Sequence, residues 1–191
     1  VGGVVLAAGS SRRAGQVNKL LVPIDGVPMV RRVVMNALEA GIGPLVVVLG
    51  HQSEAVRAVL DDLPVQLTHN ADHADGMGGS IAVGIEALAA HPVTGALVLL
   101  GDMPWVRPED LAKLAGEHTP STQHLIVAPV APGGRRGNPV LWPVAAFADL
   151  ERLRGDVGGR GLIEKAGDAV ALVPVEHDGI LRDLDVPAAS T

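Results

Sequence analysis

Short, continuous apolar runs recur in the first half of the chain, and each is followed by a glycine. The runs cover residues 4–7, 45–49 and 96–100, and the glycines are Gly9, Gly50 and Gly101. Continuous runs of Val, Leu and Ala are typical of strands buried on both faces, as in a parallel sheet. The pattern therefore predicts three buried parallel strands.

Helical periodicity fills the segments between these strands. Apolar side chains repeat at i, i+3 and i+4 from Val30 to Leu38, with Pro28 at the expected start and Gly41 just past the end. Further helices are predicted over residues 53–60, with Ser53 as the candidate N-cap, 80–91 and 108–118. Because strands alternate with helices, we expect right-handed crossovers and an α/β fold. Its sheet would be doubly wound and mostly parallel, of the Rossmann-like type.

The pattern changes in the C-terminal half. Residues 125–128 and 140–142 look like strands joined by the glycine- and arginine-rich turn 132–139, which predicts a β-hairpin or a substrate loop. Helices are expected over residues 145–153 and 160–166, and a strand over 170–175. No repeat or linker divides the chain, so we expect residues 1–191 to form a single domain.

Composition narrows the possible classes of protein. Hydrophobic residues make up 48% of the chain but aromatic residues only 2%, so Ala, Val, Leu and Ile must fill the core. A net charge of -6 argues against a general nucleic-acid binder. Without cysteine there can be no disulfide or thiolate metal site. No run approaches the ~20 apolar residues of a membrane span, and no signal peptide is evident, so we expect a cytoplasmic protein without membrane partners.

The segment from Gly9 to Lys19 has the chemistry of an anion site. It follows the first strand and so lies at the carboxyl edge of the sheet, where such folds place ligands. Glycines let backbone amides approach a phosphate, and Arg13 and Lys19 supply positive charge. Five residues separate Gly9 from Gly15, which excludes a P-loop. By composition alone, an exposed basic loop remains the alternative.

Asp102 follows the strand that ends at Leu100 and is expected at the same sheet edge. A carboxylate there can hold Mg²⁺, which prefers one or two carboxylates together with phosphate oxygens and water. A strand-ending turn with a helix-capping Asp is the alternative. The loop 76–80 precedes a predicted helix, so Ser80 could also be only an N-cap. The histidines, including His51, His69 and His73, lack a ligand spacing and are interpreted as structural.

A longer series of motifs resembles the MobA-like nucleotidyltransferase family. Its signature is carried by Leu-Ala-Ala-Gly-x-Ser-x-Arg-x-Gly at residues 6–15 and Asn-Lys-Leu-Leu at 18–21. Matching motifs follow in the family's order at residues 76–81, 101–104, 136–141, 155–160 and 183–187. Ala14, where methionine is usual, and the Val-Pro-Ala tail depart from the pattern. Within the family, the chain is most similar to the CTP:molybdopterin cytidylyltransferases, which are accessory proteins of molybdenum hydroxylases.

The resemblance implies transfer of CMP from CTP to the terminal phosphate of molybdopterin, with Mg²⁺ and release of pyrophosphate. A molybdenum hydroxylase or its chaperone would be a partner. The same resemblance assigns catalysis to Arg13, Lys19 and Asp102. It assigns metal binding to Asp102 together with Asp185, which we prefer over Asp183. It assigns substrate binding to Leu6, Ala7, Ala8, Gly9, Ser11, Arg13, Lys19, Gly78, Gly79, Ser80, Asn138 and Arg160, with Arg136 beside the acceptor and Asp156 orienting Arg160.

Several alternatives remain at this stage. CTP is favoured over GTP because guanylyltransferase relatives tend to have glycine where this chain has Ala8, and a Cβ there narrows the space for a base. The acceptor could instead be a sugar phosphate, methylerythritol phosphate or phospholactate. A molybdenum-cofactor carrier that transfers nothing, or a regulatory nucleotide sensor, would bind similar ligands without chemistry.

Overall fold

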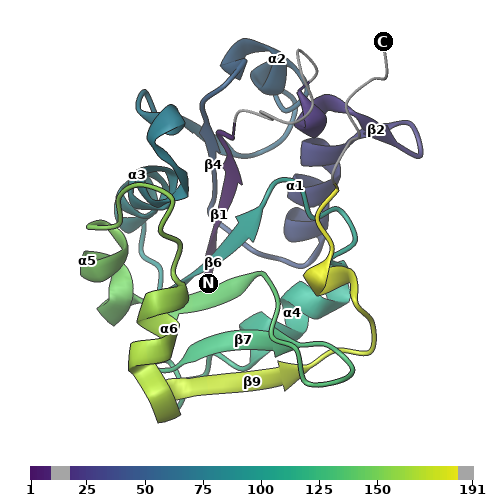
Figure 1. The fold of residues 1–191 in the computed structure, drawn as a ribbon. Coiled ribbons are helices and arrows are strands. Elements are labelled where there is room, and N and C mark those ends of the chain that lie inside the picture. Colours follow the sequence, from purple (N-terminus) through teal and green to yellow (C-terminus); the bar gives the residue numbers. More distant parts are fainter. Residues whose placement is uncertain (10–17, 185–191) are drawn as a thin grey trace.

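The computed structural model describes residues 1–9 and 18–184, and its centre is a seven-stranded sheet with the order β5-β4-β1-β6-β8-β7-β9 (Figure 1). The strands are β1 Gly2–Ala7, β4 Leu45–Leu49, β5 Gln66–His69, β6 Gly95–Leu100, β7 Ile126–Val130, β8 Val140–Pro143 and β9 Val170–Pro174. A separate hairpin joins β2 Pro23–Ile24 to β3 Val27–Pro28. The helices are α1 Met29–Glu39, α2 Ser53–Ala58, α3 Met77–Ala89, α4 Pro108–Gly116, α5 Phe147–Leu150 and α6 Arg160–Ala166.

Strands β5, β4, β1 and β6 are mutually parallel, which confirms the predicted doubly wound, mostly parallel sheet. The chain runs outward from β1 through β4 to β5 and then returns to β6 on the other side of β1. Ligands of open α/β sheets bind at such a reversal, outside the carboxyl ends of the strands. Among the described strands of this sheet, β8 alone runs against its neighbours β6 and β7, and it forms the predicted hairpin with β7.

Two layers of helices cover the sheet, α1 and α4 on one face and α3 and α5 on the other (Figure 1). Val4 and Val5 are both fully buried but belong to different core clusters, because successive strand residues point to opposite faces. This explains why β1, β4 and β6 are continuously apolar. Within the described ranges, no helix has the length and apolar character needed to cross a bilayer.

Several predicted boundaries are wrong. Helix α3 begins at Met77, so Ser80 lies inside the helix and is not its N-cap. Helix α2 begins at Ser53, but the N-cap position is taken by Gln52 with a φ of 52°. The helix predicted over 145–153 is a 3₁₀ turn, Val144–Ala146, followed by the single-turn α5. For α3, the loop 154–158 packs against Gly76 and Gly78 and sets the start of the helix, so local propensity is overridden there.

Gly84 provides a test of how closely α3 packs on the sheet. A Cβ at this position would lie 2.3 Å from Val4 Cγ1 and 2.9 Å from Val48 Cγ2. Overpacking costs about 1–3 kcal/mol and offsets the helix-propensity gain of about 1 kcal/mol, so Gly84→Ala is expected to lower the free energy of unfolding by up to about 2 kcal/mol. The control is Gly116→Ala at the end of α4, where the new Cβ meets nothing within 4 Å. Urea unfolding of both variants measures the difference, and equal stability would contradict this packing.

Candidate active site

An ion pair joins the two loops that leave β1 and β6. Lys19 opens a 3₁₀ turn, Lys19–Leu21, and its Nζ lies 2.6 Å from Asp102 Oδ2. The ends of the two strands are also tied together, since Gly101 N–H donates to the Leu6 carbonyl at 3.0 Å. Both charged side chains are about one fifth exposed, at 22% for Lys19 and 21% for Asp102. A cation and a carboxylate therefore lie together, accessible to solvent, where the strand order reverses.

The C-terminal segment reaches the same place. Leu184 N–H donates to the Asp102 carbonyl at 3.0 Å, so the exposed Asp183 lies one residue from a direct contact with the Asp102 backbone. Asp185, the preferred second metal ligand, lies outside the described residues. The structure thus brings Asp183 and Leu184 to the Asp102 loop, a contact that sequence spacing alone does not predict.

The described carboxylates suit a cation that takes most of its ligands from its substrate. Across residues 1–9 and 18–184, no three His, Asp or Glu side chains gather into a ready-made metal site. Mg²⁺ does not need one, because one or two carboxylates, phosphate oxygens and water complete its shell. Asp102, partly exposed beside Lys19, fits that use. The rings of His51 and His69 lie near that of His73, with centroid distances of 6.4 and 6.3 Å. These three side chains do not form a metal cluster.

The strand-end residues of the predicted nucleotide loop offer backbone groups more than side chains. Ala7 and Ala8 are buried at 0% and 2% exposure on opposite faces of the sheet. The Ala8 Cβ is therefore enclosed in the core cluster that contains α3, and the expectation that it directly narrows an open base site is not met. Gly9 is exposed, and a Cβ there would meet nothing within 4 Å. Ser11 and Arg13 lie outside the described residues.

The first turn of α3 is explained partly by packing. Gly78 N–H donates to the Gly155 carbonyl at 2.8 Å, and a Cβ on Gly78 would lie 2.8 Å from Arg154 N. Gly78 is thus required where loop 154–158 crosses the helix. Ser80 is only 4% exposed, and its hydroxyl accepts a hydrogen bond from Asn70 Nδ2 at 3.0 Å. Of Gly78, Gly79 and Ser80, which were predicted to bind the nucleotide, Gly79 leaves the helix surface most open to a ligand.

The motifs assign no role to two buried asparagines that support these loops. Asn18 is 3% exposed, and its Oδ1 accepts from Leu20 N–H at 3.1 Å, which caps the turn that carries Lys19. Asn70 is 4% exposed, and besides donating to Ser80 it accepts from Asp72 N–H at 3.1 Å. Asn18 stands in the Asn-Lys-Leu-Leu motif, which marks its position but not its capping role, whereas no motif or spacing in the sequence marks Asn70.

The two residues predicted to hold the acceptor lie in different settings. Asn138 is half-buried, and its N–H donates to the Ile180 carbonyl at 2.9 Å. Arg160 begins α6 with a side chain that is 85% exposed, and its Nε donates to Glu164 at 2.8 Å. The prediction that Asp156 orients Arg160 is wrong, since the guanidinium pairs one turn along its own helix. Arg136 is exposed in the turn between β7 and β8.

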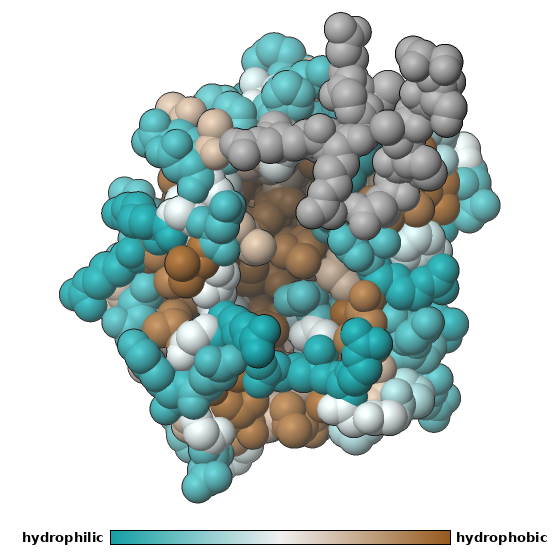
Figure 2. Space-filling view, in the orientation of Figure 1, coloured by the Kyte–Doolittle hydropathy of each residue, from teal (hydrophilic) through white to brown (hydrophobic). Residues whose placement is uncertain are grey.

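Figure 2 shows a hollow near the centre of this face, with hydrophobic residues at its floor and hydrophilic residues along its lower rim. In the same orientation, Figure 1 places β1 and β6 behind it. Open α/β sheets bind ligands outside the carboxyl ends of their strands, where the Lys19–Asp102 pair lies in this protein. The sheet and its two helix layers form a Rossmann-like α/β fold with an ion pair at its ligand-binding edge.

Comparison with known proteins identifies the family. Residues 3–170 match the model described as the MobA-like NTP transferase domain, and the chain belongs to this family. The resemblance carried by the motifs is thereby confirmed. The structure of Rv0371c from Mycobacterium tuberculosis H37Rv superposes with a TM-score of 0.78 at 32% identity, covering 97% of this chain and 91% of that one. A structure of Rv0371c in complex with manganese matches with a TM-score of 0.70 at 29% identity, over 91% and 87% of the two chains.

Curated relatives carry different names. Nicotine blue oxidoreductase from Paenarthrobacter nicotinovorans is 29% identical over 97% of this chain and 92% of its own length. Bifunctional protein GlmU from Syntrophotalea carbinolica is 40% identical over 60% of this chain. The aligned region spans only a quarter of that GlmU protein, 25% of its length. Membership of the family fixes the class of domain, and the particular reaction must be argued from the site.

Proposed function

We propose that this protein transfers CMP from CTP to the terminal phosphate of a molybdopterin-type phosphomonoester, with Mg²⁺ and release of pyrophosphate. The observation that carries the proposal is the Lys19–Asp102 pair, 2.6 Å between Nζ and Oδ2, at the carboxyl ends of β1 and β6. A triphosphate bound there would meet a cation and a metal-binding carboxylate together. The manganese complex of the similar Rv0371c supports a divalent cation for the family.

The reaction forms one bond and breaks one bond. An oxygen of the acceptor phosphate attacks the α-phosphorus of CTP, and the bond from that phosphorus to the oxygen bridging to the β-phosphate breaks, so that pyrophosphate leaves. The positive charge of Lys19 offsets charge on the phosphates, and Asp102 holds the metal. Bound Mg²⁺ would act as a Lewis acid on phosphate oxygens. No nucleophilic side chain is needed, because positioning and charge neutralisation supply the acceleration.

The remaining roles follow from the same placement. The segment of Leu6, Ala7, Ala8 and Gly9 would present backbone amides to the triphosphate, with Ser11 and Arg13 beyond it. Gly79 would lie against the base, with Gly78 and Ser80 shaping the turn around it. Asn138 and Arg160 would bind the acceptor. Asp185 would be the second metal ligand, which is supported by the contact of the preceding Leu184 with the Asp102 backbone.

The choice of CTP rests on an indirect effect of Ala8. Guanylyltransferase relatives tend to have glycine at this position. Ala8 is buried in the core cluster that contains α3, so its Cβ would affect the base site only through packing.

A pyrophosphate-release assay tests the proposal, using each of the four NTPs with Mg²⁺ and a panel of acceptors. The panel contains molybdopterin, a sugar phosphate, methylerythritol phosphate and phospholactate. We expect release to be fastest with CTP and molybdopterin. Faster release with another pair would replace the proposed substrates within the same chemistry. Tight pterin binding without release from any pair would favour a molybdenum-cofactor carrier, and recovery of a bound nucleotide unchanged would favour a sensor.

An oxidoreductase is the second candidate, favoured by the similarity to nicotine blue oxidoreductase over nearly the whole chain. It predicts consumption of a reduced nicotinamide cofactor by a pigment or pterin substrate in the absence of any NTP. Absorbance at the cofactor band, followed without NTP, separates this function from nucleotidyl transfer. Steady oxidation without pyrophosphate release would contradict the proposed transferase.

A further inference from the structure

The segment that follows β9 crosses the molecule from the far edge of the sheet to the candidate active site. We call residues 175–184 the C-terminal strap. It begins with Val175 N–H, which donates to the Val130 carbonyl at 2.9 Å, and it ends with Leu184 N–H on the Asp102 carbonyl at 3.0 Å. Ile180, inside the 3₁₀ turn Gly179–Leu181, is fully buried. The strap is therefore buried at Gly179 and Ile180 and held by backbone hydrogen bonds at both of its ends.

The strap lies between two loops of the proposed site. On one side Gly179 packs so closely that a Cβ there would lie 2.5 Å from the Trp105 carbonyl oxygen, and the Arg182 guanidinium sits 4.7 Å from the Trp105 ring centroid. On the other side the Ile180 carbonyl accepts the Asn138 N–H at 2.9 Å. The loop of Asp102 and the turn of Asn138 are thus joined through the strap.

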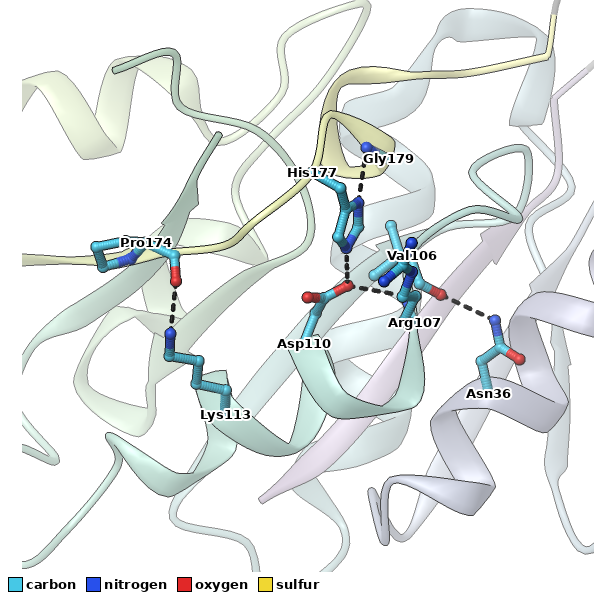
Figure 3. Close-up of polar contacts among 8 residues, drawn as sticks. All are labelled: Asn36, Val106, Arg107, Asp110, Lys113, Pro174, His177 and Gly179. Atoms are coloured by element: carbon cyan, nitrogen blue, oxygen red, sulfur yellow. Dashed lines mark hydrogen bonds and ion pairs between the residues drawn. The ribbon is translucent and has the colours of Figure 1, made fainter. Parts of the chain in front are cut away.

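His177 is the polar anchor of the strap (Figure 3). Its Nδ1 accepts from Gly179 N–H at 2.9 Å, which leaves the ring proton on Nε2. Nε2 then donates to Asp110 Oδ2 at 2.8 Å. Both side chains are largely buried, at 16% exposure for His177 and 10% for Asp110. The imidazole therefore uses both nitrogens, one to fold the strap into its turn and the other to fix that turn to α4.

Asp110 is itself held firmly at the start of α4. The same Oδ2 accepts from Arg107 N–H at 2.9 Å in a capping box. The loop just before the helix is tied to α1, because Asn36 Nδ2 donates to the Val106 carbonyl at 2.8 Å. One turn further along α4, Lys113 Nζ donates to the Pro174 carbonyl at 2.6 Å, at the end of β9 (Figure 3). The helix that follows the Asp102 loop is thus a fixed support for His177.

We propose that His177, held by Asp110, is a positioning residue that keeps the C-terminal strap against the Asp102 loop and the Asn138 turn. It touches no reacting atom. By fixing the strap it sets where Leu184 meets the Asp102 backbone and how the turn that carries Asn138 is held. The role in catalysis rests on the proposed function, whereas the role in holding the strap does not.

Four substitutions separate the two hydrogen bonds of His177. His177→Ala removes both. His177→Asn can still accept from Gly179 N–H in an Asx turn but is too short to reach Asp110, whereas His177→Gln can donate to Asp110. Asp110→Asn keeps one side-chain oxygen that can accept from both Arg107 N–H and His177 Nε2. His118→Asn is the matched control, because His118 Nε2 also bonds a carbonyl, that of Thr94, but beside Gly95 at the opposite end of β6.

We expect His177→Ala and His177→Asn to lower kcat by about 10- to 100-fold, the usual effect of removing a residue that orients metal ligands. The Mg²⁺ concentration for half-maximal rate should rise, while KM for the nucleotide should stay within about twofold because its loop follows β1. His177→Gln and Asp110→Asn should retain most activity, as should His118→Asn. Wild-type kcat and Mg²⁺ dependence in His177→Asn would overturn the catalytic role.

Amide hydrogen exchange tests the strap independently of activity. In His177→Ala and His177→Asn we expect faster exchange at the Leu184 and Asn138 amides, with the β1 and β4 amides unchanged. Unchanged protection of both amides would overturn the positioning role. If the wild-type protein releases no pyrophosphate with any substrate pair, the proposed function fails, and the exchange result still decides whether His177 holds the strap.

Discussion

Asp102→Ala is expected to abolish pyrophosphate release while leaving the protein folded. A metal in such a site supplies several kcal/mol of charge stabilisation, so we expect kcat to fall by about 10³-fold or more. The fold should survive because the side chain is 21% exposed and the contact with Leu184 is made by the Asp102 carbonyl, which the variant keeps. Pyrophosphate release and a thermal melt measure the two effects.

The control for this substitution is Asp168→Ala. Asp168 is an exposed carboxylate just before β9, which runs parallel to β7 and therefore begins at the edge of the sheet opposite Asp102. It should retain full activity. Turnover like that of the wild type in Asp102→Ala would end the assignment of this carboxylate to the metal, and the pair with Lys19 would then be only a structural link between two loops.

Lys19→Ala should cause the second largest loss. Removing one donor that stabilises developing charge typically costs about 10²–10³-fold in kcat, and we expect a loss in this range. When the triphosphate binds, the Lys19 ammonium would pair with its phosphates in place of Asp102. Loss of Lys19 should therefore change both kcat and KM for CTP. Lys19→Arg should recover activity only in part, because a planar guanidinium does not reproduce a compact ammonium.

Steady-state rates for these variants should be compared with Lys165→Ala, which removes an exposed lysine near the end of α6. A melting temperature near that of the wild type would show that the loss is not unfolding. If Lys19→Ala melts much earlier yet turns over normally per folded molecule, the lysine serves stability and the phosphate assignment is wrong.

The parallel half of the fold could be predicted because its strands are buried on both faces. That burial produces the uninterrupted apolar runs of β1, β4 and β6. Strand β5 was missed, because Gln66 and His69 at its ends are exposed and the segment carries little apolar signal. The start of α3 was misplaced because Gly76, with a φ of 121°, and the loop that packs on Gly78 set the helix end.

The part of the site that depends on the order of strands and helices could be predicted from the sequence. Lys19 and Asp102 follow parallel strands, so their meeting at one sheet edge follows from the order of elements. The pairing of Asp110 with His177 spans 67 residues between segments with no shared periodicity, and no sequence pattern indicates it. Arg160 differs, because its partner Glu164 lies at the i,i+4 spacing of the helix expected over residues 160–166, and helix geometry favours this pair over the predicted Asp156.

The most direct test of nucleotidyl transfer at the Lys19–Asp102 pair follows the α-phosphate itself. The protein is incubated with CTP labelled at the α-phosphorus, Mg²⁺ and molybdopterin, and the label is located after separation of the products. We expect label to appear in the pterin product in a one-to-one ratio with released pyrophosphate, and Asp102→Ala to form neither. Label that stays in CTP, or leaves as free CMP without joining the acceptor, would contradict it.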